Sequence, residues 1–328
     1  MSFINIMLAV EEPQTIDTGL AGKVLRIASA FDARIELHHC LYDAAAARPS
    51  RSRAAGMARI RAAVELRHRQ LESSAAMLRG LGLAVTTSVR WDYPPWEGII
   101  RQVMRHRTDL LVVRSSRVGP VGRLFLTHTD FRLIEACPCP LLLIKTQRPY
   151  KDLSLIAAVD PLHPREGVVA LDDAVLEAAT ALGSIPGAHL KVYHAAPPWE
   201  DVVRETAELR TAPEVVQPDI RSAYRESIAG RVRELARRHG VPAANIHIGE
   251  GRASEALPRF AHAEGADIVV LGAESRSMLK RIVIGHTAER VLDELDADVL
   301  VVKSRQFRSP VSRQSAHRVE RLDVRSAI

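Results

Sequence analysis

The sequence contains few aromatic residues and few cysteines, and these scarcities exclude several classes of protein. Phe, Trp and Tyr make up only 4% of the 328 residues, too few for a groove that stacks the bases of single-stranded nucleic acid on aromatic side chains. Cys40, Cys137 and Cys139 form no CxxC pair and no even disulfide framework, which is typical of a reducing compartment. We therefore expect neither nucleic acid as a partner nor disulfide bonds.

Long apolar runs and familiar catalytic signatures are also missing. No apolar run approaches the roughly 18 residues that a membrane-spanning helix needs. The opening MSFINIMLAVEEP lacks the basic region and the small-residue cleavage site of a signal peptide. The chain contains no GxSxG, no GxxxxGK followed by Ser or Thr, and no HExxH. We predict a cytoplasmic protein with no membrane span and no catalytic residues, and we expect no enzyme activity beyond weak ATP hydrolysis.

Two basic segments account for the net charge of +6. The first segment contains Glu65 as its only acid and has these basic residues: Arg48, Arg51, Arg53, Arg59, Arg61, Arg67 and Arg69. The second is the tail, with Arg313, Arg318, Arg321 and Arg325. Such runs usually form a solvated helix face or a loose tail, and the alternative is a surface for an anionic partner.

One histidine-rich segment resembles a metal site. His38, His39 and Cys40 are adjacent in a segment that reads as a strand. Neighbouring residues of a strand point to opposite faces, so the two histidines cannot both face one metal. We therefore predict a structural role for them and no metal, apart from Mg²⁺ that accompanies a nucleotide.

The chain repeats itself. RLFLTHTDFRLIEACPCPLLLIK (123–145) and RIVIGHTAERVLDELDADVLVVK (281–303) share one pattern, with Thr129 aligned to Thr287 at a shift of 158 residues. The same shift aligns Asp109 with Asp267, and INIMLAVEEP (4–13) resembles SLIAAVDPLHP (154–164). A fixed register of this kind indicates an internal duplication. We predict domains at 1–148 and 152–306, and an unpacked basic tail at 307–328.

Each half alternates short apolar runs with longer helical patterns. The strands are predicted at 3–10, 34–41, 84–91, 109–114 and 140–145, and again at 153–159, 188–195, 244–249, 267–272 and 298–303. Several runs, such as LLVV and DIVVL, are continuously apolar, which indicates burial on both faces of a parallel sheet. We therefore predict an α/β fold of two open parallel five-stranded sheets with helices on both faces.

Ligands of such sheets bind beyond the carboxyl ends of the strands, where the strand order switches. In the second half, Asp160 follows the first strand, Gly272 ends the fourth, and Gly285-His286-Thr287 opens the next helix. Glycine lets a ligand approach the backbone, and a helix start offers free N–H groups to a phosphate. The alternative is that His286 or Thr287 only caps the helix.

These residues resemble a known family. GAES, nine residues and then GHTAERV, followed by DVLVVK, is similar to the universal stress protein domain, whose nucleotide-binding members carry Gly-x-x-Gly, nine residues and Gly-Ser/Thr at this place. The tandem arrangement over about 3–305 resembles the two-domain, E-type members. The resemblance implies a Rossmann-like sheet of strand order 3-2-1-4-5 in each half. It also implies an intramolecular pseudo-dimer through the last strands, 140–145 against 298–303, and a homodimer as a further assembly.

The resemblance also implies a site for ATP or AMP in the second half only. Asp160 would face the base or the ribose, and Ala195 would line the base pocket. The phosphate loop would contain these residues: Gly272, Ala273, Ser275, Gly285, His286 and Thr287. Two of them depart from the family pattern, since Ser275 replaces a glycine and the bulky His286 replaces a small Ser or Thr. A non-glycine residue forced to positive φ costs about 1–2 kcal/mol, so the loop can take another path.

The first half has no glycine of the motif. At a shift of 158, Arg114 replaces Gly272, Arg117 replaces Ser275 and Thr127 replaces Gly285. We predict that this half is a structural partner; the alternative is that Arg114 and Arg117 bind another anion. The leading function is therefore a non-catalytic stress-response protein that binds a small ligand in its second domain. The alternatives are a lipid-like or other anionic ligand, weak ATP hydrolysis, and an interaction module that uses the basic segments.

Overall fold

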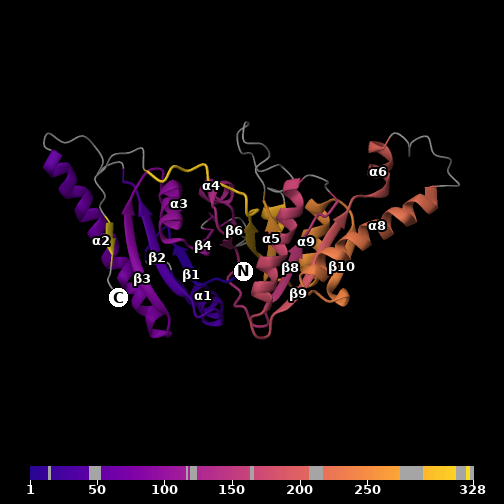
Figure 1. Ribbon diagram of the computed structural model, residues 1–328. Helices are drawn as coiled ribbons and strands as arrows, with labels where there is room; N and C mark the ends of the chain where they lie inside the picture. Colours follow the sequence, from indigo (N-terminus) through magenta and orange to yellow (C-terminus); the bar gives the residue numbers. More distant parts are fainter. Residues whose placement is uncertain are drawn as a thin grey trace. The chain divides into compact units, whose positions relative to one another are not determined.

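The apolar runs become parallel strands in two separate units. The computed structural model describes residues 1–13, 16–43, 53–115, 117–118, 124–162, 166–206, 217–273, 291–314 and 323–325. One unit contains Met1–Lys151 and Phe307–Ile328, and the other contains Asp152–Gln306. Figure 1 shows that each unit is a sheet with helices packed on it.

The first unit follows the predicted strand order. Its strands are β1 (Asn5–Ala9), β2 (Arg34–Leu41), β3 (Ala84–Trp91), β4 (Leu110–Arg114) and β7 (Leu141–Ile144), with a small ribbon of β5 (Arg117–Val118) and β6 (Leu124–Phe125). Its helices are α1 (Thr18–Ala30), α2 (Arg53–Gly80), α3 (Pro95–His106) and α4 (His128–Ala136). The parallel order β3-β2-β1-β4-β7 is the predicted 3-2-1-4-5.

The second unit repeats this order. Its strands are β8 (Ser154–Ala158), β9 (His189–Ala196), β10 (Ile246–Glu250), β11 (Ile268–Gly272) and β12 (Asp298–Val302). Its helices are α5 (Glu166–Gly183), α6 (Trp199–Glu205), α8 (Gln217–Arg238) and α9 (Ala253–Ala263), with a 3₁₀ turn at Ala243–Asn245. The order β10-β9-β8-β11-β12 confirms the predicted duplicated α/β fold.

The helices bury the faces that their apolar spacing predicts. On α2, Val64, Leu71 and Leu78 are completely buried, and Figure 1 shows this helix lying along β3. On α5, Val175 and Ala178 are likewise buried. The central strands are buried on both faces, since Leu8 and Val270 have no exposed surface. Each sheet is therefore the middle layer of a three-layer unit, and only its strand ends are open to a ligand.

The tail differs from the expectation of an unpacked segment. In its described part, β13 (Asp323–Arg325) pairs antiparallel with β3, with Val324 opposite Val89. Upstream, the buried Arg101 donates a 3.1 Å hydrogen bond from Nε to the Ser312 carbonyl oxygen. An edge strand offers unpaired backbone groups, and the tail satisfies some of those on β3. The tail was predicted to be unpacked because it is basic. The alternating pattern of LDVR (322–325), which is typical of a short strand, was overlooked.

Candidate ligand site

The predicted site lies where two neighbouring strands of the second unit end. β8 and β11 are adjacent and parallel, with Ala158 opposite Leu271, so their carboxyl ends lie at one edge of the sheet. Asp160 follows β8, and Gly272 is the last residue of β11. The next residue, Ala273, donates its backbone N–H to the Val302 carbonyl oxygen of β12 at 2.9 Å. The other predicted residues, Ser275, Gly285, His286 and Thr287, lie outside the described residues.

Asp160 is held through its backbone and presents its side chain outward. Its N–H donates to the Asp172 carboxylate at 3.0 Å, and Asp172 is a buried residue of α5. The Asp160 side chain is 51% exposed, with Oδ1 3.9 Å from His194 Nδ1. A carboxylate only accepts hydrogen bonds. Asp160 is therefore placed to accept hydrogen bonds from ligand hydroxyl or amino groups at this edge.

A buried histidine fixes the end of the first strand in both units. His194 Nδ1 donates to the Val159 carbonyl oxygen at 2.9 Å, and His39 Nδ1 does the same to Val10 at 2.9 Å. Because a carbonyl only accepts, the proton lies on Nδ1 in both rings. Burial lowers the pKa of His39, which keeps this ring neutral. His194, rather than the predicted Ala195, is therefore the β9 side chain next to Asp160.

His194 and Asp172, which contact Asp160 at this edge, were not among the site residues predicted from the sequence. Ala195, the residue predicted from β9, is partly exposed and lies opposite Gly249 of β10. Neighbouring strand residues point to opposite faces, so Ala195 points away from the face that His194 occupies. The repeat held the missing signal for His194, because the structural register places His39 at the same point of the first unit.

Gly272 has a packing role. A Cβ built at this position would lie 2.6 Å from Cγ of Leu171 on α5. A side chain here would therefore collide with Leu171 and force that side chain, or α5 with it, to shift. The close approach of helix and strand accounts for the glycine without a ligand.

The first unit places a long side chain at the same point. Arg114 ends β4 and donates a hydrogen bond to the Asp17 carboxylate, with which it forms an ion pair. Asp17 is also the N-cap of α1, where it accepts 2.8 Å from the Leu20 N–H. Arg114 therefore already has an anion inside the protein. Arg117, its suggested partner, has a side chain outside the described part of the structure.

The helix start of the first unit is closed by three polar side chains. Asp130 Oδ2 accepts hydrogen bonds from the Thr127 N–H at 2.7 Å, the Thr127 hydroxyl at 3.0 Å and the Ser115 hydroxyl at 2.9 Å. In return, Thr127 Oγ1 accepts 3.2 Å from the Asp130 N–H, which completes a capping box. Burial raises the pKa of Asp130. This helix start is occupied by the chain itself and repels a phosphate when Asp130 is ionised.

The second unit has small residues in all three places. At the shift of 158, Ser115 becomes Ala273, Thr127 becomes Gly285 and Asp130 becomes Ala288. The capping residue of the first unit is therefore Thr127, the counterpart of Gly285, and neither member of the shared His-Thr pair. The two halves therefore differ in two ways. They differ in their glycines, and they differ in the side chains that would compete with a ligand for the helix start.

Other features of the described residues bear on function. No group of three or more His, Cys, Asp or Glu side chains among them is arranged to hold a metal ion. His38 and His39 bond different partners, since His38 Nδ1 lies 2.7 Å from the Ser88 hydroxyl. The three cysteines are free thiols. Within the part of the chain that the structure describes, no helix is long and apolar enough to cross a membrane.

Both halves of the chain are similar to one known protein family. The model of the universal stress protein family matches residues 3–145 and again 166–303. The chain belongs to the universal stress protein family. Among curated relatives, the Universal stress protein E of Photorhabdus laumondii is 29% identical over 240 residues, covering 70% of this chain and 72% of that protein. Its counterpart from Escherichia coli K12 is 26% identical over 234 residues, with the same coverage.

Solved structures agree with the tandem fold. A putative universal stress protein from Pseudomonas aeruginosa UCBPP-PA14 aligns with a TM-score of 0.68 and 26% identity, covering 92% of this chain and 94% of that one. A universal stress protein from Archaeoglobus fulgidus aligns with a TM-score of 0.60 over 92% of this chain at 15% identity. The second likeness supports the fold alone. Together, the matches identify a stress-response protein with two family domains in tandem.

Proposed function

We propose that the second unit of this tandem stress protein binds an adenine nucleotide, without catalysing a reaction, at the carboxyl ends of β8 and β11. The proposal rests on one observation, which is that the two units carry different side chains at three aligned positions. Ser115, Thr127 and Asp130 fill and charge the helix start of the first unit, whereas alanine and glycine stand at the corresponding sequence positions of the second. A helix start without a competing carboxylate suits a phosphate.

Two further features support a nucleotide in the second unit. Asp160 presents an exposed carboxylate at the strand end, which can accept hydrogen bonds from ribose hydroxyls. Lys280 and Arg281 add positive charge to the sequence between Ser275 and Gly285, and cations favour phosphate groups. The family pattern of nucleotide-binding members assigns Gly272 and Gly285 to the same loop, and both are retained here.

Native mass spectrometry of the full chain with ATP and AMP tests the proposal. We expect one nucleotide per chain, and we expect Asp160→Ala to weaken binding about tenfold through loss of a hydrogen bond to a charged group. Glu200→Ala, a change on α6, is the control and should bind as the wild type does. Binding of no nucleotide, or of one in each unit, would refute the proposal. Because we propose no catalysis, the wild type should form ADP from ATP no faster than Asp160→Ala does.

A further inference from the structure

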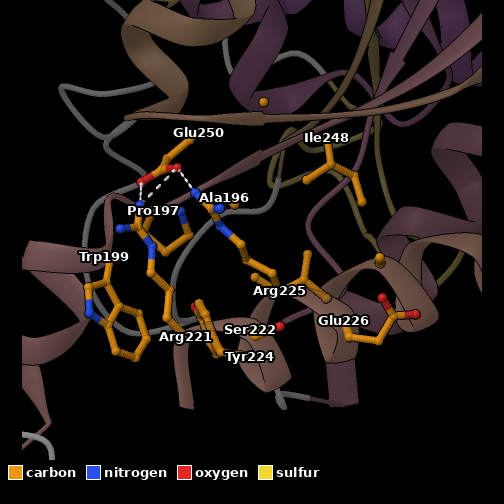
Figure 2. A pocket seen from close by; sticks show the side chains of 13 residues that line it. Ala196, Pro197, Trp199, Arg221, Ser222, Tyr224, Arg225, Glu226, Ile248 and Glu250 are labelled. Atoms are coloured by element: carbon orange, nitrogen blue, oxygen red, sulfur yellow. Dashed lines mark hydrogen bonds and ion pairs between the residues drawn. The ribbon is translucent and has the colours of Figure 1, made fainter. Parts of the chain in front are cut away.

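The second unit contains a pocket apart from the proposed nucleotide site. It has a volume of about 500 Å³ and lies at the ends of β9 and β10, beside α8. This volume falls within the roughly 300–1,000 Å³ typical of small-molecule pockets. None of the residues assigned to the nucleotide lines it, and the nearest in sequence is Ala196, which follows Ala195. Figure 2 shows its polar wall, where Arg221 and Arg225 both reach Glu250.

The polar wall carries more positive than negative charge. Arg221 Nη2 donates to Glu250 Oε1 at 3.0 Å, and Arg225 Nη2 donates to Oε2 of the same carboxylate. Glu226 also borders the pocket, but its side chain is 76% exposed and pairs with Arg233 at 3.0 Å. Two guanidinium groups and one carboxylate leave one positive charge. Arg221 Nε is also buried, with no acceptor among the residues that the structure describes.

Most of the other lining side chains are apolar or aromatic, with Ser222 as the exception. Ile248 is 40% exposed although it lies on a strand, and it borders the pocket together with Ile228 and Ala229. The rings of Trp199 and Tyr224 are also part of the lining, with centroids 5.9 Å apart. An exposed isoleucine on a strand loses contact with water when an apolar group covers it, which favours binding by about 25 cal/mol per Å². The pocket therefore suits a ligand with an apolar body.

The first unit fills the corresponding place with its own side chains. Trp91 pairs with Leu41 in the sheet register, as Glu250 pairs with Ala196. Trp91 is buried, and its ring lies 5.5 Å from that of Tyr42. The residue that provides the carboxylate in the second unit is thus replaced by a packed aromatic ring. Among the described residues, a buried tryptophan thus stands in the first unit at the register position that Glu250 holds beside the pocket.

We propose that this pocket binds a small organic monocarboxylate. The ligand carboxylate lies beside Glu250 on the guanidinium groups of Arg221 and Arg225, and its apolar body covers Ile248 near Trp199. Guanidinium groups bind carboxylates through paired hydrogen bonds, and each side chain here has N–H groups beyond those given to Glu250. One ligand charge balances the single excess charge, whereas a dianionic phosphate would leave one negative charge uncompensated beside Glu250.

The indole N–H signals of ¹⁵N-labelled full-length protein test this proposal. The chain has three tryptophans, Trp91, Trp96 and Trp199, and Trp199→Phe assigns the signal next to the pocket. The probes are 3-phenylpropionate, octanoate, inorganic phosphate and the neutral 3-phenylpropanol. We expect saturable shifts of the Trp199 signal with the two carboxylates, and at least about tenfold weaker binding of phosphate and the alcohol. Comparing the affinities of 3-phenylpropionate and octanoate shows whether the pocket prefers an aromatic or an aliphatic body.

Two substitutions on α8 provide the comparison. Arg225→Gln should weaken both carboxylates about tenfold, because it removes a charge-assisted bond to the carboxylate. Arg237→Gln changes an exposed arginine on the same helix whose partner is Glu234, and neither residue lines the pocket, so this variant should bind as the wild type does. Unchanged backbone amide signals of α5, which belongs to the second unit and does not line the pocket, report an intact fold of that unit. ATP should not displace the carboxylates, which separates this site from the nucleotide site.

Three outcomes would overturn the proposal. They are a Trp199 signal that does not saturate below about 10 mM of either carboxylate, equal affinity in Arg225→Gln and the wild type, and phosphate binding as tight as the carboxylates. Failure of ATP to bind anywhere would leave this result untouched, because the pocket shares no residue with the proposed nucleotide site.

Discussion

Asp130 Oδ2 accepts a 2.7 Å hydrogen bond from the backbone N–H of Thr127, and Thr127 Oγ1 accepts one from the Asp130 N–H. This reciprocal pair closes the start of α4 in the first unit. A phosphate at the same point would have to displace a carboxylate that already satisfies the helix. The pair therefore gives a physical reason, in terms of contacts, to expect no phosphate at this point of the first unit.

The capping pair should stabilise α4 locally. We expect Thr127→Ala to cost about 1 kcal/mol, because it removes the side-chain acceptor for a helix N–H. Amide hydrogen exchange within α4 measures this loss as faster exchange. His128→Ala is the matched control, since His128 is exposed at the next position. Equal exchange in the two variants would mean that the capping box contributes nothing to this helix.

Gly272 should be intolerant of any side chain. We expect Gly272→Ala to destabilise the second unit by about 1–3 kcal/mol, because its Cβ would lie 2.6 Å from Leu171 Cγ. Gly230→Ala on α8 meets nothing within 4 Å, and it should be neutral or stabilising by up to about 1 kcal/mol. Thermal unfolding compares the two variants. Leu171→Ala should rescue Gly272→Ala in part, and the absence of any rescue would contradict the packing explanation.

The first unit should lose stability in mild acid. Burial lowers the pKa of His38 well below its usual value, with Arg90 adding to the effect, and burial also lowers the pKa of His39. Both rings are neutral in the folded unit, but they take up protons near pH 6.5 when it unfolds. The stability that they contribute is present above about pH 6.5 and is lost as the pH falls toward their folded pKa values.

Unfolding temperatures between pH 7.5 and pH 5 measure this effect. His38 Nδ1 lies 2.7 Å from the Ser88 hydroxyl, which donates to Glu36 at 2.6 Å, so the ring donates to Ser88. His38→Asn keeps an N–H donor near the Nδ1 position and does not titrate. We expect a smaller loss of unfolding temperature over this pH range in the variant. An equal or larger loss would show that His38 is not a source of the acid sensitivity.

The sequence was sufficient for the fold because the fold depends on patterns. Apolar runs such as LLVV and DIVVL predicted buried strands, and the internal repeat predicted that the order would occur twice. Positions on one helix face, such as Val64 and Leu71, are buried as their spacing indicated. The tail was misjudged because four-residue patterns are weak, and because β13 is held by an edge strand far away in sequence.

The site was less predictable because its contacts join distant segments. Asp160 was found from its place after a strand, but Asp172, which bonds its N–H, lies on α5 and has no recognisable motif. The partner of Arg114, Asp17, lies 97 residues away. Similarly, the pocket beside Glu250 depends on arginines of α8 whose spacing resembles that of any solvated helix. Sequence motifs indicate where strands end. Which side chains meet at those ends is determined by the packing of segments that are distant in the sequence.

The most direct test introduces the capping pair of the first unit, Thr127 and Asp130, at the corresponding positions of the second unit. Gly285→Thr with Ala288→Asp introduces the counterparts of Thr127 and Asp130, and Thr127→Ser is the control that keeps a hydroxyl cap in the first unit. Calorimetric titration with ATP measures the number of sites and their affinity. We expect one site per chain in the wild type and in the control, and none in the double variant. Undiminished ATP binding by the double variant, or two sites in the wild type, would contradict it.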